Sequence, residues 1–180
     1  MLRKLASIIL LLVLVPALAV QADEITITDS DIDGDETWTA DNTYLLDGFV
    51  FVEDGESLTI EPGTVVKGKP GTGEDASALI VARGGKIYAD GTATDPIIFT
   101  AESDDVSDPN DLPLDARGLW GGVILLGKST VNEPGGEAHI EGIPETEPRG
   151  TYGGDDPEDN SGIFRYVSIR HGGSNIGAGN

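Results

Sequence analysis

The sequence predicts an all-β solenoid, a parallel β-helix, that follows an N-terminal signal peptide. The composition includes 25 Gly and 10 Pro, and Val, Ile and Thr are frequent, which favours strands and turns over helices. No segment after Asp23 shows the sustained apolar period of an amphipathic helix. Short β-branched strands, bracketed by Gly, Pro, Asn or Asp, recur at roughly 18 to 27 residues, which is the pattern of stacked solenoid coils.

Residues 1–22 have the layout of a secretory signal peptide. Arg3 and Lys4 precede an unbroken apolar run over residues 8–15, and the small residues of Val20-Gln21-Ala22 predict cleavage before Asp23. The run is short for a membrane span, which needs about 20 residues; a short N-terminal anchor is the alternative. We therefore expect an exported protein, extracellular or at the outer cell surface, whose mature chain has no transmembrane span.

The charge and the cysteine content exclude several classes of partner and site. The net charge is −21, and a surface of this sign repels nucleic acid and anionic lipid. It suits divalent cations, or a saline exterior that screens the repulsion. The chain has no cysteine, which excludes disulfides, thiolate metal sites and a lipid-anchored cysteine at the cleavage site.

The mature chain divides into N-terminal strands that cap the solenoid, over residues 23–57, and coils with acidic inserts, over residues 58–180. Alternation of Ile25 and Ile27 with threonines predicts the first strand, an acidic turn follows, and residues 44–52 predict a pair of short strands. Further strands are expected at 58–60, 64–66, 79–81, 97–99, 123–125 and 166–169. The polar inserts fall at 68–76, 101–118 and 141–162.

A β-sandwich is the competing all-β interpretation. It predicts strands every 8–12 residues or so, joined by hairpin turns. Only the turn at Asp47-Gly48 fits that pattern, so the solenoid is favoured.

Several runs resemble a known family. Residues 37–102, LDARGLWGGVILLGKS (114–129), residues 140–162 and RYVSIRHGG (165–173) look like the N-terminal half of secreted bacterial right-handed β-helix proteins. Such relatives are longer and often carry a C-terminal sorting domain. The resemblance therefore implies a right-handed β-helix, and it leads us to expect an N-terminal fragment whose solenoid is incomplete at its C-terminus. Most members of the family have no assigned activity.

Two acidic inserts predict calcium binding. Closely spaced carboxylates on loops stiffened by Pro and Gly can supply the oxygen ligands that calcium needs, and a bound cation would offset their repulsion. The alternative is a solvated acidic loop. The candidate ligands are Asp104, Asp105, Asp108 and Asp111 in one insert, and Asp155, Asp156 and Asp159 in the other.

Residues 29–35 also resemble the start of a calcium loop. Carboxylates stand at alternate positions with Gly34 among them, but the twelfth position, which needs a carboxylate, is Ala40. We therefore interpret this segment as an acidic surface turn.

The last predicted strand carries the one candidate catalytic residue, Arg170. Strand alternation predicts Val167 and Ile169 inward, and Tyr166, Ser168 and Arg170 outward. A basic residue beside acidic loops resembles the polysaccharide lyases that share this fold. In those enzymes an arginine or lysine removes a proton next to a uronate carboxylate that calcium neutralises. The simpler alternative is an ion pair between Arg170 and a neighbouring acid.

Three further residues have two interpretations each. His139 and His171 are too far apart in sequence to form a spaced pair, and lone turn histidines are the simpler interpretation. Trp120 would either stack on a sugar ring or cover the apolar column, and the second is favoured.

The sequence favours a non-enzymatic exported protein, because it shows no nucleophile–base set. We expect an adhesion, glycan-binding or structural role, with an extracellular polysaccharide or a cell-surface component as partner. The alternative is a calcium-dependent polysaccharide lyase or hydrolase on the same fold. A calcium-stabilised spacer without another ligand is the third possibility.

Overall fold

A computed structural model of the chain describes residues 22–176. The predicted signal peptide therefore lies, except for Ala22, outside the described residues. Those residues form an all-β structure that contains short 3₁₀ helices and no α-helix. None of their helices is long and apolar enough to cross a membrane.

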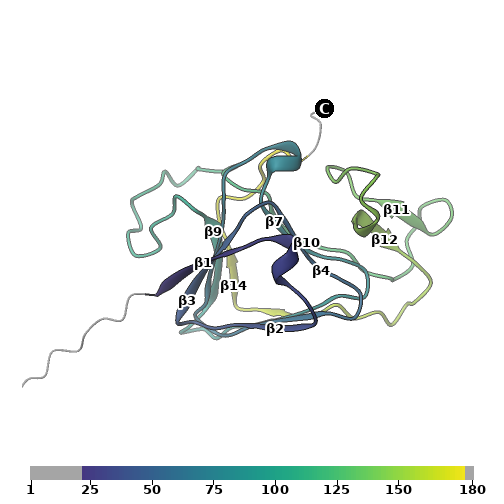
Figure 1. Cartoon of the computed structure of the whole chain (residues 1–180), viewed down its shortest axis with the longest axis horizontal. Coiled ribbons are helices and arrows are strands. Elements are labelled where there is room, and N and C mark those ends of the chain that lie inside the picture. The colour runs from purple at the N-terminus through teal and green to yellow at the C-terminus, as the bar shows by residue number, and fades with distance from the viewer. Residues whose placement is uncertain (1–21, 177–180) are drawn as a thin grey trace, which may run out of the picture.

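Three parallel sheets form the walls of a solenoid with a roughly triangular cross-section (Figure 1). The chain passes from sheet A to sheet C to sheet B, and then returns to sheet A one coil further along. Sheet A contains β1 (Asp23–Ile27), β3 (Asn42–Leu46), β6 (Val65–Gly68), β9 (Ile97–Ala101) and β14 (Val167–Ile169). Sheet B contains β2 (Asp35–Trp38), β5 (Ser57–Ile60), β8 (Lys86–Asp90) and β13 (Gly162–Arg165), and sheet C contains β4 (Phe49–Val52), β7 (Ala78–Val81) and β10 (Gly122–Leu125).

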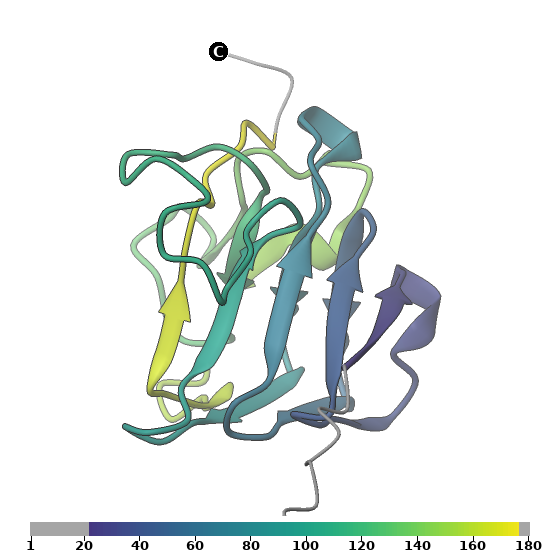
Figure 2. The same ribbon diagram turned by 90° about the vertical axis from the view of Figure 1, so that its left-hand side faces the viewer.

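The coils wind clockwise as they recede from the viewer in Figure 1, whose near end carries β1, so the solenoid is right-handed. Figure 2 shows the strands of sheet A side by side, from β1 at one end to β14 at the other. The predicted right-handed parallel β-helix is confirmed.

Register between the coils builds the core. In sheet A the pairing places Ile25, Tyr44, Val66, Phe99 and Ile169 in one row across the five strands. Such rows point into the prism, where buried aliphatic and aromatic side chains from all three sheets form one continuous cluster. Removing this apolar surface from water is the main favourable term in folding. Ile169 lies on the inward row, as predicted, and is 50 % exposed because β14 is the last described strand of its sheet.

Trp120 belongs to this core. Its side chain is fully buried, and its indole lies against Gly68, where a Cβ would come within 2.5 Å of Cε3. Indole Nε1 donates a hydrogen bond to the main-chain oxygen of Arg170 at 2.7 Å. The prediction that Trp120 covers the apolar column is confirmed, and a role in stacking on a sugar is excluded by its burial.

The sequence interpretation missed three strands of sheet B and misjudged one turn. β2, β8 and β13 read DETW, KIYAD and GIFR; their outward charged residues interrupt the apolar run by which the other strands are recognised. Asp47-Gly48 does not form a hairpin. Gly48 has φ +87 and turns the chain at a corner between β3 of sheet A and β4 of sheet C.

The third insert is longer than predicted, and it is structured. It occupies residues 126–161, between β10 and β13, and contains β11 (Glu137–His139), η3 (Pro148–Gly150) and β12 (Thr151–Gly153), with β11 and β12 antiparallel. It covers the outer face of sheet C, where a second apolar cluster contains Phe51, Ile80 and Ile143. Of two smaller 3₁₀ turns, η1 (Asp29–Asp31) lies against β4 of sheet C, and η2 (Gly73–Asp75) lies at the corner between sheets A and C.

Arg149 ties this insert to the first coils. Its Nη1 lies 2.9 Å from Asp29 Oδ2 and 2.8 Å from Glu53 Oε1, and its Nη2 lies 2.7 Å from Glu147 Oε2. The guanidinium carbon sits 3.9 Å from the centroid of the Phe51 ring. A bidentate, partly buried arginine of this kind orders the groups around it.

The pKa of the Glu147 carboxyl lies below its usual 4.5, chiefly because Arg149 donates side-chain hydrogen bonds to it, against an opposing effect of burial. A carboxyl whose pKa is lower in the folded chain than in the unfolded chain contributes its full stabilisation at any pH above the unfolded pKa. This contribution is lost as the pH falls through the folded value. The tether should therefore weaken in acid, below pH 4.5.

We expect Gly68→Ala to lower the free energy of unfolding by about 1–3 kcal/mol, because its Cβ would overpack against Trp120. Urea denaturation followed by tryptophan fluorescence measures the change. Gly172→Ala is the matched control, since its Cβ would lie 3.6 Å from Nε1 of the same indole, and it should change stability by less than about 0.5 kcal/mol. Equal losses in the two variants would contradict this packing.

Replacing Arg149 by Met should speed amide hydrogen exchange across β11, η3 and β12 about tenfold, because hydrogen bonds to charged groups contribute roughly 1.5–3 kcal/mol. Exchange in β3, β6 and β9 should not change. The unaltered chain should show the same local loosening below pH 4.5, after correction for the intrinsic pH dependence of exchange. Arg165→Met, which removes an exposed pair with Asp90 on sheet B, is the control. If it loosens the insert equally, the tether assignment is wrong.

Candidate functional site

A pocket of about 480 Å³ lies where the segment after β14 meets the second insert. The insert joins β9 to β10 and forms one wall. The residues after β14 form the other, and they are held by main-chain hydrogen bonds from Gly118 to Gly172 and from Leu119 to His171. The lining residues are Asp104, Val106, Asp108, Pro109, Asp111, Leu112, Pro113, Leu114, Ala116, Arg170 and His171.

Asp104 is a buried carboxylate, with 4 % of the residue exposed. It accepts a hydrogen bond from the hydroxyl of Thr100, on β9. The main-chain oxygen of Asp104 accepts a further hydrogen bond from Lys67 Nζ at 2.7 Å. The start of the insert is therefore fixed to both β6 and β9, and it holds the carboxylate at one position.

Arg170 directly follows β14. Its Nη1 lies 3.9 Å from Asp104 Oδ2, and its Nε donates to Ser168 Oγ at 3.1 Å. The bond from Trp120 to its main-chain oxygen fixes its backbone to the core. Because the guanidinium has one hydrogen bond among the described residues and its side chain is 39 % exposed, donors remain available on the pocket side.

His171 completes the group. Its Nδ1 lies 2.9 Å from the main-chain oxygen of Ala116, so Nδ1 carries a proton and donates to that oxygen. Its Nε2 faces Asp104 Oδ2 at 3.9 Å. The residue has φ +56, one of two positive values among the non-glycine residues in the described range, and strained backbone of this kind is concentrated at functional sites.

The three side chains give the pocket a mixed chemistry. Asp104 offers acceptor oxygens and Arg170 offers donors, while the Nε2 atom of His171 accepts a hydrogen bond when the imidazole is neutral and donates one when it is protonated. Both nitrogens lie at 3.9 Å from the carboxylate, which is ion-pair range and too long for a hydrogen bond. The arrangement can receive a ligand that both donates and accepts hydrogen bonds.

Comparison with known proteins gives the family. A family profile described as a pectate-lyase-like β-helix domain matches residues 30–180. The chain belongs to the pectate-lyase-like β-helix family. No curated protein and no solved structure matches it at a significant level. Membership in the pectate-lyase-like family establishes the β-helix, and the same fold can serve binding or catalysis.

The structure brings several predicted site residues of this family member together. Arg170, proposed as a catalytic base, and Asp104, Asp108 and Asp111, proposed as calcium ligands, line the same pocket. Asp105 does not line it. The pKa of its carboxyl is lowered by a hydrogen bond from the hydroxyl of Ser107 and, to a smaller extent, by one from the main-chain N–H of Ser107.

The calcium candidates of the third insert lie apart from this pocket. Asp159 accepts a hydrogen bond from the main-chain N–H of Lys128 at 2.6 Å, and Asp156 accepts one from that of Glu158. Asp155 adjoins them in sequence. Across residues 22–176, no three His, Asp or Glu side chains are placed so that they could hold a metal ion. Calcium binding by either insert therefore stays a prediction.

The earlier acidic segment, residues 29–35, is a surface turn as interpreted. Asp29 pairs with Arg149, the Asp31 carboxylate accepts from Thr28, and Asp35 accepts from the Ser57 hydroxyl. These carboxylates have different partners, and none of them lines the pocket of Arg170.

Sequence reasoning missed the place of His171 in the site. Asp104 and His171 are distant in sequence, and only the coil register brings the end of β9 beside the end of β14. The sequence feature near His171 is the run HGG at residues 171–173, shortly after the strand. It indicates a turn, and it does not identify what the imidazole contacts.

Proposed function

We propose that this chain is an exported β-helix protein without catalytic activity that binds extracellular polysaccharide in the pocket of Asp104, Arg170 and His171. The observation that carries the proposal is the convergence of a buried carboxylate, a guanidinium and an imidazole on one pocket. A sugar ring presents adjacent hydroxyls, each of which donates and accepts, so it needs both kinds of partner within a few ångströms.

The remaining walls also suit a sugar. Val106, Leu112 and Leu114 line the pocket beside the polar group, and Leu114 is fully exposed. Ligand sites commonly combine an apolar lining with a few placed polar groups. The C–H faces of a pyranose can pack on such a wall while its hydroxyls meet the polar side chains.

Binding is favoured over catalysis by a hydroxyl, thiol or amine nucleophile because of the residue types present. No hydroxyl, thiol or amine side chain lines the pocket. Asp104 is engaged by Thr100 and Arg170 by Ser168. Export is supported by the signal-peptide pattern of residues 1–22 and by the high negative charge, and the family assignment is compatible with it.

The alternative is a calcium-dependent polysaccharide lyase or hydrolase. It is favoured by one observation, the presence of Arg170 in the same pocket as Asp104, Asp108 and Asp111. In this alternative calcium on the aspartates would neutralise a uronate carboxylate, and Arg170 would take the neighbouring proton.

Titration calorimetry with hexagalacturonate and with cellohexaose should detect binding of at least one of them. Arg170→Ala should weaken that binding at least about tenfold, the loss of one charge-assisted hydrogen bond. Arg165→Ala is the matched control, because Arg165 is exposed on β13 and pairs with Asp90. This variant should bind the oligosaccharide with the same affinity as the unaltered chain.

Two results would contradict the proposal. If Arg170→Ala and Arg165→Ala bind alike, the pocket is not the binding site. If incubation with polygalacturonate produces the ultraviolet absorbance of unsaturated sugars, and Arg170→Ala abolishes it, the lyase alternative is correct.

The calcium prediction has a separate test in thermal melting. If an insert binds calcium, millimolar calcium raises the melting midpoint relative to chelator, because a ligand of the folded state stabilises it by mass action. If the second insert holds the ion, the double variant Asp108→Asn with Asp111→Asn should show no rise in melting midpoint. The double variant Asp155→Asn with Asp156→Asn should keep the rise. The reverse pattern assigns the ion to the third insert, and an unshifted midpoint in the unaltered chain refutes calcium binding.

A further inference from the structure

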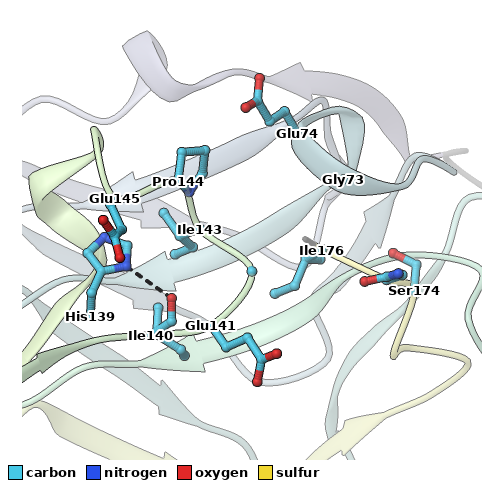
Figure 3. A pocket seen from close by; sticks show the side chains of 12 residues that line it. Gly73, Glu74, His139, Ile140, Glu141, Ile143, Pro144, Glu145, Ser174 and Ile176 are labelled. Atoms are coloured by element: carbon cyan, nitrogen blue, oxygen red, sulfur yellow. Dashed lines mark hydrogen bonds between the residues drawn. The ribbon is translucent and has the colours of Figure 1, made fainter. Parts of the chain in front are cut away.

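A second pocket, of about 960 Å³, lies between the η2 segment, the third insert and the residues that follow β14 (Figure 3). Gly73 and Glu74 contribute one wall, and residues 139–145 contribute another. Ser174 and Ile176 close the end opposite Glu145 and His139, as Figure 3 shows. None of the residues predicted as functional from the sequence, apart from the lone His139, lines this pocket.

Carboxylates surround the pocket. Glu74, Glu141 and Glu145 lie on three different sides of it (Figure 3), and no Lys or Arg is among its lining residues. His139 offers no free donor to an anion, because its Nδ1 lies 3.0 Å from the oxygen of Ile140 and its Nε2 lies 2.9 Å from the oxygen of Glu147. The pocket therefore favours a cationic group.

Ser174 supplies an independent indication of a ligand. The residue is 8 % exposed and lines the pocket. Its hydroxyl is the one buried side-chain polar atom without a hydrogen-bond partner in the described part of the chain. Leaving such a group unpaired is costly, and buried polar groups in native structures almost always have a hydrogen-bond partner. A bound hydroxyl or amine would pair it.

An apolar surface separates these polar groups. Ile140, Ile143 and Ile176 line the pocket between the carboxylates and Ser174. This combination fits a ring with one apolar face, several hydroxyls and a positive charge. A flexible basic peptide would satisfy the carboxylates and would leave the rigid apolar wall without a matching face.

We propose that this second pocket binds the protonated amino-sugar units of a glycan. The inference rests on the proposed glycan-binding function and extends it to a second subsite that prefers cationic sugars. In this arrangement the ammonium groups of successive units pair with Glu74 and with Glu145, a ring lies on the isoleucines, and a hydroxyl bonds Ser174.

The two pockets share one segment. Arg170 and His171 line the first, and Ser174 and Ile176, a few residues later, line the second. A polysaccharide that follows this segment can contact both pockets, so the chain would discriminate glycans by the charge of successive sugars.

Titration calorimetry of the full chain at physiological salt tests the proposal. The probes are a glucosamine tetramer with free amines, its N-acetylated counterpart and tetralysine. The free-amine tetramer should bind, and each of the other two should bind at least about tenfold more weakly, the loss expected when a charged pair or a shape match is removed.

Variants locate the site. Glu74→Gln with Glu145→Gln should weaken binding of the glucosamine tetramer about tenfold. Asp33→Asn with Asp41→Asn removes the same charge from exposed turns of the first coils and should leave binding unchanged. Ser174→Ala should weaken binding several-fold while the melting midpoint stays the same, because its hydroxyl has no partner to lose. All the carboxylates altered here are exposed, so folding is not at risk.

Several results would overturn the inference. The first is that the glucosamine tetramer does not bind. The second is that tetralysine binds as tightly as the glucosamine tetramer, which would indicate a basic peptide as partner. The third is that the two double variants lose the same affinity for the glucosamine tetramer, which would indicate diffuse charge attraction. Arg170→Ala separates this inference from the proposed function. If Arg170→Ala weakens hexagalacturonate or cellohexaose binding while no variant changes the affinity for the glucosamine tetramer, only the second subsite is rejected. If the Glu74 and Glu145 variant weakens glucosamine binding while Arg170→Ala leaves the binding of the other two sugars unchanged, only the first pocket is rejected.

Discussion

The parallel, in-register pairing of each coil with the coil before it is the constraint on which the rest of the structure depends. One row of sheet A runs Ile25, Tyr44, Val66, Phe99 and Ile169, and equivalent rows in sheets B and C complete the buried column. The pairing satisfies the main-chain donors and acceptors of the strands, which cannot be buried unpaired. It also places apolar side chains one above another, so that the column excludes water.

Because the register is set by the strands, the corners can accept long insertions. The chain makes a short turn between β3 and β4 and long excursions between β9 and β10 and between β10 and β13. The cost of a longer loop rises only slowly with its length. Both pockets arise from such excursions where they meet the segment after β14, so their chemistry depends on the inserts while their position depends on the solenoid.

The sequence predicts the fold well where a strand carries a continuous apolar run. The strands at β4, β7 and β9 were recognised for this reason, and Trp120 was correctly placed in the column. Strands β2, β8 and β13 were missed because the charged residues Asp35, Lys86 and Arg165 face outward and break the run. The association of Asp104 with His171 was beyond sequence reasoning, since it depends on which corner of one coil lies beside which corner of the next. The antiparallel pair β11 and β12 was missed because its residues read as a polar loop.

Inter-strand nuclear Overhauser contacts test the central claim most directly. Neighbouring strands lie about 4.8 Å apart, and the solenoid predicts amide-to-Hα contacts in parallel register between β5 and β8, for example from Thr59 to Tyr88, and between β8 and β13. Antiparallel Hα-to-Hα contacts should occur, within the described chain, only in the β11–β12 pair, for example between His139 and Thr151. Antiparallel contacts between β5 and β8 would contradict the solenoid and remove the basis for both pockets.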